Sequence, residues 1–224
     1  MCGRYNITTP AEAMRRIFGI AGPLPNLPAR YNVAPTQDVP IVRFNPETRE
    51  RSLDMVRWGL IPHWAKDASV GYKVINARAE AIDSAPSFRS AFRSRRCLIP
   101  ADGFYEWQKT PQGKQPYMVR LKGGGVFAMA GLWENWKNPE GQWVRTCTII
   151  TGEPNEVAAP IHNRMPVILD QGDYGKWLGE AAAEPRDLLA LLRPYPGERM
   201  AAYRIGTAVN NVRNDDPSLV EPVA

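Results

Sequence analysis

The stretch that decides the fold is RCLIPADGFYEWQKTPQGKQPYMVRLKGGGVFAMAGLWE, residues 96–134. Its apolar and aromatic residues come in short runs separated by Gly, Pro and polar residues, which is typical of β-strands joined by turns. The glycine-rich Lys122–Gly125 lacks the surrounding pattern of a phosphate-binding loop, and we interpret it as a hairpin turn. We predict four strands in this stretch: Arg96–Ile99, Phe104–Gln108, Pro116–Leu121 and Val126–Glu134.

The same pattern continues on both sides of this stretch. Asn138–Gly141 has the composition of a second hairpin turn. Further strands are expected at Leu53–Leu60, Tyr72–Ala77, Trp143–Thr151 and Pro166–Leu169. Residues 21–40 carry five prolines, and we expect this segment to be ordered but irregular.

The expected helices are few and short. Thr9-Pro10-Ala11-Glu12 resembles a capping box, with Thr9 as the cap, and Gly19 is expected to end that helix. Other helices are expected at Pro86–Ser94, Asp173–Leu178 and Pro185–Leu192, with one or two helical turns in Glu153–Ile161. Because no linker or repeat divides these parts, we predict one compact α+β domain over residues 1–224.

The composition is that of a globular protein with a basic surface. Of the 224 residues, 44% are hydrophobic and 23% charged, which gives enough apolar side chains for a sizeable core. The formal net charge is +5. This charge is compatible with a polyanionic partner such as nucleic acid, and equally with a merely basic protein.

Cysteine and histidine are too few for a metal centre or a disulfide framework. The three cysteines, Cys2, Cys97 and Cys147, have unrelated spacings, and there are only two histidines. We therefore expect no metal and no cofactor. No apolar run approaches the ~20 residues that span a bilayer, and the first ten residues lack a secretory signal. We expect a cytoplasmic protein with no membrane partner.

Cys2 is the residue with the clearest chemistry. If Met1 is removed, Cys2 carries both an α-amine (pKa ~7.7–8.0) and a thiol (pKa ~8.5), each partly nucleophilic near neutral pH. An amine condenses with an aldehyde to an imine, and the thiol can then close on the imine carbon to form a five-membered thiazolidine. Two alternatives stay open: Cys2 is chemically idle, or its thiol attacks a carbonyl as in an N-terminal hydrolase.

Other residues could assist this chemistry, although each also has a purely structural explanation. Glu106 lies inside the aromatic strand GFYEW, and on a buried face it would be suited to proton transfer. His162 follows an apolar segment and precedes a strand. Asn76 and Arg78 are two apart, so they share one face of an expected strand. The seven tryptophans are mostly expected in the core, but one or two beside arginines could stack on exposed bases.

Taken together, the motifs resemble the SRAP family, whose members are called SOS-response-associated peptidases or abasic-site processing proteins. The resemblance runs from residue 1 to about residue 214. It is carried by MCGR (1–4), RYNVAPTQ (30–37), WGLIPHW (58–64), INARAE (75–80), RRCLIPADGFYEW (95–107), KQPY (114–117), AGLWE (130–134) and IHNRMPVIL (161–169).

The resemblance implies a compact α+β fold in which curved, mostly antiparallel sheets form a barrel-like core flanked by short helices. It also implies a basic groove for single-stranded DNA and a thiazolidine cross-link between Cys2 and the ring-opened abasic sugar. The protein would act in the DNA damage response as a monomer, associated with the nucleoid when bound to DNA. Some lyase activity would be possible if the thiol step were slow.

The resemblance also assigns individual residues. Cys2, Asn76, Glu106 and His162 match the catalytic positions: Asn76 holds the N-terminal residue and the sugar, Glu106 is the acid or base, and His162 is the site histidine. The positions that match DNA contacts are Arg4, Arg78 and Arg164 for phosphates, Pro35 and Trp107 as apolar borders of the lesion, and Thr151 as a polar contact. Arg89 and Arg93 lie in a poorly matching segment and receive no role. Peptide hydrolysis through Cys2 and noncovalent binding of single-stranded DNA remain the alternatives.

Overall fold

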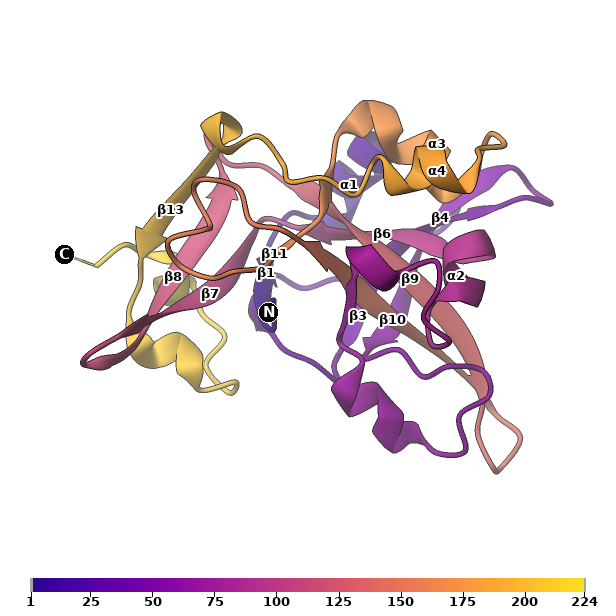
Figure 1. The fold of residues 1–224 in the computed structure, drawn as a ribbon, viewed down its shortest axis with the longest axis horizontal. Coiled ribbons are helices and arrows are strands. Elements are labelled where there is room, and N and C mark those ends of the chain that lie inside the picture. Colours follow the sequence, from indigo (N-terminus) through magenta and orange to yellow (C-terminus); the bar gives the residue numbers. More distant parts are fainter. Residues whose placement is uncertain (1, 224) are drawn as a thin grey trace.

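Five strands close into a barrel. The computed structural model describes residues 2–223, and Figure 1 shows the barrel strands crossing one half of the molecule. The order around the ring is β10–β4–β3–β6–β9, and β9 pairs with β10 to close it. The pairing of β4 with β10 is parallel, and the other pairings in the ring are antiparallel. The ring consists of β3 (Asp38–Asn45), β4 (Glu50–Trp58), β6 (Arg96–Ala101), β9 (Phe127–Lys137) and β10 (Trp143–Gly152).

Short strands extend the barrel at one end. The C-terminal half of β10 pairs in parallel with β5 (Asn76–Arg78) and antiparallel with β11 (Met165–Pro166). β12 (Ile168–Leu169) pairs with β9. Strand β5 is thereby fixed to the barrel by its pairing with β10, although it is only three residues long.

A second, fully antiparallel sheet lies beside the barrel, on the left in Figure 1. Its strand order is β13–β8–β7–β1–β2. The strands are β1 (Tyr5–Ile7), β2 (Arg30–Val33), β7 (Gly103–Thr110), β8 (Gly113–Leu121) and β13 (Met200–Arg204). Only Asp102 separates β6 of the barrel from β7 of this sheet, so one continuous segment of chain links the two sheets.

The helices are short and cover the outside. The α-helices are α1 (Ala11–Phe18), α2 (Arg89–Ser94), α3 (Tyr174–Leu178) and α4 (Pro185–Leu189). The 3₁₀ helices are η1 (Ala68–Lys73), η2 (Ala79–Ala81), η3 (Gln171–Asp173), η4 (Gly197–Arg199), η5 (Thr207–Asn210) and η6 (Pro217–Val220). The indole of Trp177 in α3 donates a hydrogen bond of 2.9 Å to the Cys97 carbonyl, which fixes α3 to barrel strand β6. No helix within residues 2–223 has both the length and the apolar character needed to cross a membrane.

The α+β class with mostly antiparallel, barrel-forming sheets and short helices is confirmed, as are most of the predicted strands. The strand predicted at Tyr72–Ala77 is wrong at its start, because Tyr72 and Lys73 belong to η1 and β5 begins only at Asn76. The Asp67 side chain caps η1 by accepting a hydrogen bond from the Ser69 amide. Within η1, Gly71 packs so closely on Gly59 that a Cβ on Gly71 would lie 2.8 Å from the Gly59 carbonyl oxygen. The irregular segment predicted at 21–40 contains β2 and the start of β3.

Two local predictions fail because of distant partners. Lys122–Gly125 is not a hairpin turn, because β8 and β9, which it joins, belong to different sheets. Thr9 does not cap α1; Pro10 occupies the N-cap position, and the Thr9 hydroxyl instead donates a hydrogen bond of 2.6 Å to Asp102. The hairpin at Asn138–Gly141 is confirmed, since β9 and β10 pair on either side of it.

Candidate active site

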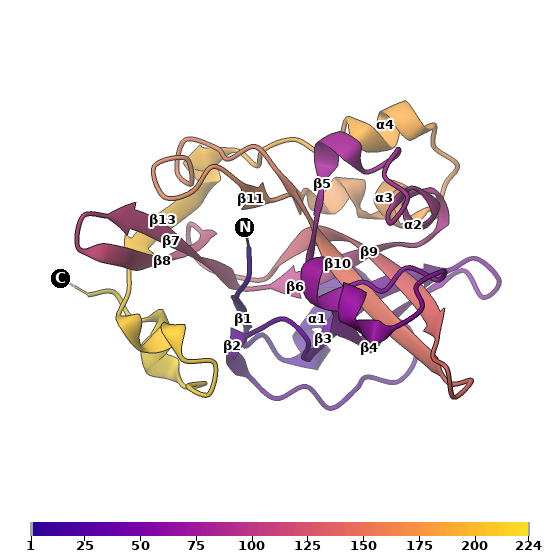
Figure 2. The same ribbon diagram turned by 60° about the horizontal axis from the view of Figure 1, so that its bottom comes forward.

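Cys2 lies where the second sheet meets the barrel. Figure 2 shows the start of the chain running between the two sheets. Immediately after it, β1 pairs with β2 and β7. The Cys2 side chain is fully buried, and its thiol donates a long hydrogen bond of 3.9 Å to the Arg4 carbonyl. Met1, whose removal the prediction requires, lies outside the described residues.

Asn76 holds Cys2 from the barrel side. Its side-chain amide donates a hydrogen bond of 2.9 Å to the Cys2 carbonyl. The Asn76 Oδ1 is buried and has no hydrogen-bond partner among residues 2–223. A buried acceptor without a partner is costly in a closed core, so its presence here indicates a place where a ligand donor can bind.

Glu106 is the acidic group of the site. It is 3% exposed, which confirms that its side chain lies on a buried face of β7. Burial raises the pKa of the Cys2 thiol well above its usual range, and the charge of Glu106 raises this pKa further. The Cys2 thiol is therefore protonated at neutral pH.

A tight turn positions His162. The Asn155 Oδ1 accepts hydrogen bonds from the amides of Val157 and Ala158, and the His162 amide donates one of 2.9 Å to the Ala158 carbonyl. The His162 Nδ1 lies 3.0 Å from the Arg164 amide nitrogen, which donates to it. The ring nitrogen Nδ1 thus contacts the backbone of Arg164, and the His162 backbone is fixed by Ala158.

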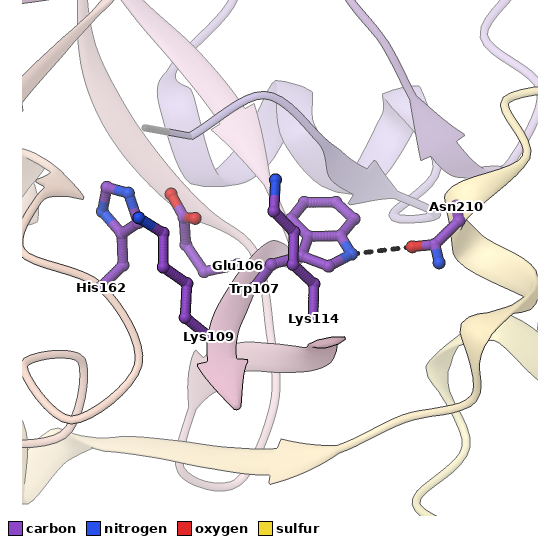
Figure 3. Close-up of a pocket in the computed structure, with 6 residues that line it drawn as sticks. All are labelled: Glu106, Trp107, Lys109, Lys114, His162 and Asn210. Carbon is purple, nitrogen blue, oxygen red and sulfur yellow. Dashed lines mark hydrogen bonds between the residues drawn. The ribbon is translucent and has the colours of Figure 1, made fainter. Parts of the chain in front are cut away.

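Glu106 and His162 face one cavity of about 430 Å³. Figure 3 shows the two side chains next to each other, with the Trp107 indole on the side of Glu106 away from His162. The Trp107 Nε1 donates a hydrogen bond of 2.7 Å to Asn210. The complete lining is Glu106, Trp107, Lys109, Lys114, His162 and Asn210.

The comparisons with known proteins agree with this geometry. The family model described as SOS response associated peptidase (SRAP) matches residues 1–212. The chain belongs to the SRAP family. It is 45% identical to the abasic site processing protein YoqW of Bacillus subtilis (strain 168), with 99% of each chain covered. It is 34% identical to the abasic site processing protein HMCES of Gallus gallus, covering 86% of this chain and 66% of that one.

Solved structures share the SRAP fold. A crystal structure of a protein from Bacteroides thetaiotaomicron superposes with a TM-score of 0.88 at 27% identity, over the full length of both chains. One from Bordetella bronchiseptica has a TM-score of 0.77 at 28% identity and covers 92% of this chain and 100% of that one.

Three predicted DNA contacts, Arg78, Thr151 and Arg164, lie close together, and none of them belongs to the cavity lining found within residues 2–223. Thr151 pairs with Arg78 in the β5–β10 ladder, and its carbonyl accepts a hydrogen bond from the Arg164 guanidinium. Arg78 is exposed. Thr151 is 1% exposed, and its hydroxyl has no hydrogen-bond partner within the described chain.

Three predicted DNA contacts have other surroundings. The Arg4 guanidinium donates hydrogen bonds of 2.8 Å to the side chain of Asn32 and the carbonyl of Val209. Arg164 forms a two-pronged ion pair with Glu80 at 2.6 and 2.9 Å. Pro35 is half-buried and does not belong to the cavity lining found within residues 2–223.

Sequence reasoning did not predict Lys109, Lys114 and Asn210 as part of the site. Lys109 follows Trp107 by two residues, so strand alternation could have placed it on the same face. Lys114 lies opposite Lys109 across the β7–β8 hairpin, a register that the intervening turn residues suggest. No feature of the sequence around Asn210 predicts its place in the site, because only the fold brings the C-terminal segment to Trp107. Within residues 2–223, no cluster of His, Cys, Asp or Glu has the composition of a metal site.

Proposed function

We propose that this protein processes abasic sites in single-stranded DNA by covalent capture through Cys2. The observation that carries the proposal is the hydrogen bond from Asn76 to the Cys2 carbonyl, which fixes the N-terminal residue next to Glu106. The names of the relatives, abasic site processing proteins, supply the substrate class. An abasic sugar exists partly as a free aldehyde, whereas an intact nucleotide offers none, so the chemistry itself selects the lesion.

The amine of Cys2 reacts first. After removal of Met1, Glu106 accepts a proton from the α-ammonium, and the free amine attacks C1′ of the ring-opened sugar to form a carbinolamine. Glu106 or His162 then donates a proton to the departing hydroxyl, and one water leaves as the imine forms. General acid–base assistance of this kind contributes about 10²–10⁴-fold to the rate.

The thiol closes the ring second. The Cys2 sulfur attacks the imine carbon, its proton passes to the imine nitrogen, and a thiazolidine results with no further loss of atoms. Because both reacting groups belong to one residue, this step is intramolecular and strongly favoured by proximity. Closure also removes the imine from which β-elimination would break the DNA strand, so lyase activity is expected only when the thiol step fails.

The electrostatics of Cys2 favour this order over peptide hydrolysis. A cysteine hydrolase attacks with a thiolate, which is promoted by a lowered thiol pKa. At Cys2, burial and the charge of Glu106 both act in the opposite direction and raise the thiol pKa. A protonated thiol beside a carboxylate base suits an amine that attacks first.

Intact-protein mass spectrometry tests the proposal. The purified chain is incubated with a single-stranded oligonucleotide that carries one abasic site, and the denatured product is weighed. The expected adduct has the summed mass of DNA and of protein lacking Met1, less one water. An N-terminal extension that keeps Cys2 inside the chain should abolish the adduct.

Variants of two buried cysteines, Cys2 and Cys97, distinguish a loss of the reaction from a loss of folding. Cys2→Ala keeps an α-amine but has no thiol, so its imine hydrolyses or eliminates and no stable adduct survives denaturation. Cys97→Ala is the matched control, because Cys97 is equally buried and lies in the barrel. The mechanism is wrong if Cys2→Ala cross-links as stably as the native chain, or if peptides are turned over without any DNA adduct.

A further inference from the structure

None of the arginines expected to contact phosphates belongs to the cavity lining found within residues 2–223. An abasic sugar carries a phosphate on both its 3′ and 5′ oxygens, so a sugar beside Cys2 brings phosphates into or next to this cavity. Of the arginines matched to phosphate contacts, Arg4 is bound to Asn32 and Val209 and Arg164 is paired with Glu80. Arg78 is exposed, but it is not one of the described residues that line the cavity. The cations that line the cavity itself are two lysines.

Lys109 and Lys114 approach the cavity from one hairpin. They are directly opposite each other in the β7–β8 ladder, and both side chains are exposed. In Figure 3 the Lys109 side chain runs toward His162 and the Lys114 side chain runs along Trp107. Neither ammonium forms an ion pair with any other residue between positions 2 and 223.

This arrangement is unfavourable for the protein alone. Like charges directly opposite in an antiparallel pair repel and destabilise the sheet. The repulsion would disappear if either lysine were neutral, and it would become an attraction if an anion lay between the two ammonium groups. Glu106, the acidic member of the lining, is 3% exposed, whereas both lysines are exposed, so the exposed charged side chains of the lining are cationic.

We propose that Lys109 and Lys114 form the subsite for a phosphodiester that flanks the abasic sugar. The inference rests on the proposed function, because it takes single-stranded DNA as the ligand. The two ammonium groups hold the phosphate as point charges, Trp107 covers the neighbouring apolar space, and the sugar extends from there toward Glu106 and Cys2. Lysines contribute here without being catalytic residues, since they bind the backbone and not the reacting carbon.

Salt-dependent binding of an intact single-stranded oligonucleotide tests the subsite apart from the covalent reaction. Each phosphate neutralised on a single strand contributes about 0.7 to the slope of log affinity against log salt. In Lys109→Gln/Lys114→Gln we expect that slope to fall by about 0.7 for one shared phosphate, and by about 1.4 for two. The affinity at low salt should weaken by about tenfold. Lys122→Gln/Lys176→Gln, which removes two exposed lysines outside the cavity, should change the slope much less.

Thermal unfolding of the free variant supplies the second measurement. Because the lysines repel each other, Lys109→Gln/Lys114→Gln should unfold at the same or a higher temperature than the native chain while binding DNA more weakly. Equal slopes for this variant and its control, or no binding of the native chain to the intact strand, would overturn the subsite. An absent adduct with abasic DNA would refute the covalent mechanism instead, and the salt slope would still decide the role of the lysines.

Discussion

The side-chain amide of Asn76 donates a hydrogen bond to the backbone carbonyl of Cys2 across 74 positions of sequence. Asn76 belongs to β5, which pairs in parallel with barrel strand β10, so the bond ties Cys2 to the strand that has the most pairing partners within residues 2–223. Cys2 is thereby held by the barrel, close enough to Glu106 for that residue to raise the pKa of its thiol.

Asn76→Ala should slow adduct formation without unfolding the protein. A displacement of about 1 Å at a reacting group can cost about 10²-fold in rate, and we expect a loss of 10- to 100-fold by that estimate. The lost hydrogen bond contributes about 1 kcal/mol to stability. Single-turnover cross-linking, followed by denaturing gel electrophoresis, measures the rate, and thermal unfolding checks the fold. A native rate in a folded Asn76→Ala protein would show that the bond does not position Cys2.

Glu106→Gln should slow the reaction by about 10²–10⁴-fold, because the amine loses its proton acceptor. The same substitution should move the titration of Cys2 to lower pH. The charge of Glu106 raises the pKa of the thiol, so removing that charge lowers this pKa and increases the thiolate fraction at any given alkaline pH. Ultraviolet absorbance of the thiolate against pH measures the shift, with Cys2→Ala as the blank for the other two cysteines. A shift to higher pH would contradict the placement of Glu106.

Thr151→Val should slow the capture of abasic DNA without lowering the stability of the fold. The Thr151 hydroxyl is buried and makes no hydrogen bond within residues 2–223, and an apolar group of the same shape removes that desolvation penalty. We therefore expect an unchanged or raised unfolding temperature together with slower capture of abasic DNA. Thr148→Val is the matched control, because Thr148 is also on β10, buried and unpartnered. Equal cross-linking rates in both variants would mean that Thr151 does not contact the substrate.

Sequence reasoning predicted four of the five barrel strands from their own residues, but it missed β3, whose first residues lie in the proline-rich segment 21–40. The closed arrangement of these strands was implied by the family resemblance and not by the strand patterns. β9 and β10 contain continuous apolar and aromatic runs bounded by turn residues, and their hairpin lies where Asn138–Gly141 predicts it. Short strands of the second sheet were missed because they are fixed by pairing with their neighbours and not by a pattern in their own residues. β1 is three residues long and contains Asn6, yet it is fixed by β2 and β7 on either side.

The candidate catalytic residues were assigned through the family pattern, which does not predict the environment of the arginines. A sequence motif carries the identity of Arg4 and Arg164 but not the side chains that approach them from distant segments. Glu80 lies 84 positions from Arg164, and Val209 lies 205 from Arg4. Residues so far apart in the sequence meet only in the folded protein, so a local motif cannot predict these contacts.

Arg4 helps to hold the C-terminal segment 207–215, whose Asn210 belongs to the cavity lining. Its guanidinium binds the Val209 carbonyl and the side chain of Asn32. The Asn32 amide in turn binds the carbonyls of Val209, Asn211 and Asn214. This network holds the C-terminal segment that presents Asn210 to the Trp107 indole.

Arg4→Ala should therefore loosen the C-terminal segment more than it weakens contact with phosphate. Two hydrogen bonds from a charged donor contribute about 3 kcal/mol, so we expect a clear loss of stability and faster amide hydrogen exchange across residues 207–215. The salt slope of binding to single-stranded DNA should stay near the native value. Arg78→Ala is the informative contrast: Arg78 is exposed, and its removal should lower the slope by about 0.7 with little effect on exchange. Arg4→Ala could instead lower the salt slope of DNA binding and leave amide hydrogen exchange in residues 207–215 at the native rate. That result would show that Arg4 binds phosphate and that Asn32 alone holds the C-terminal segment.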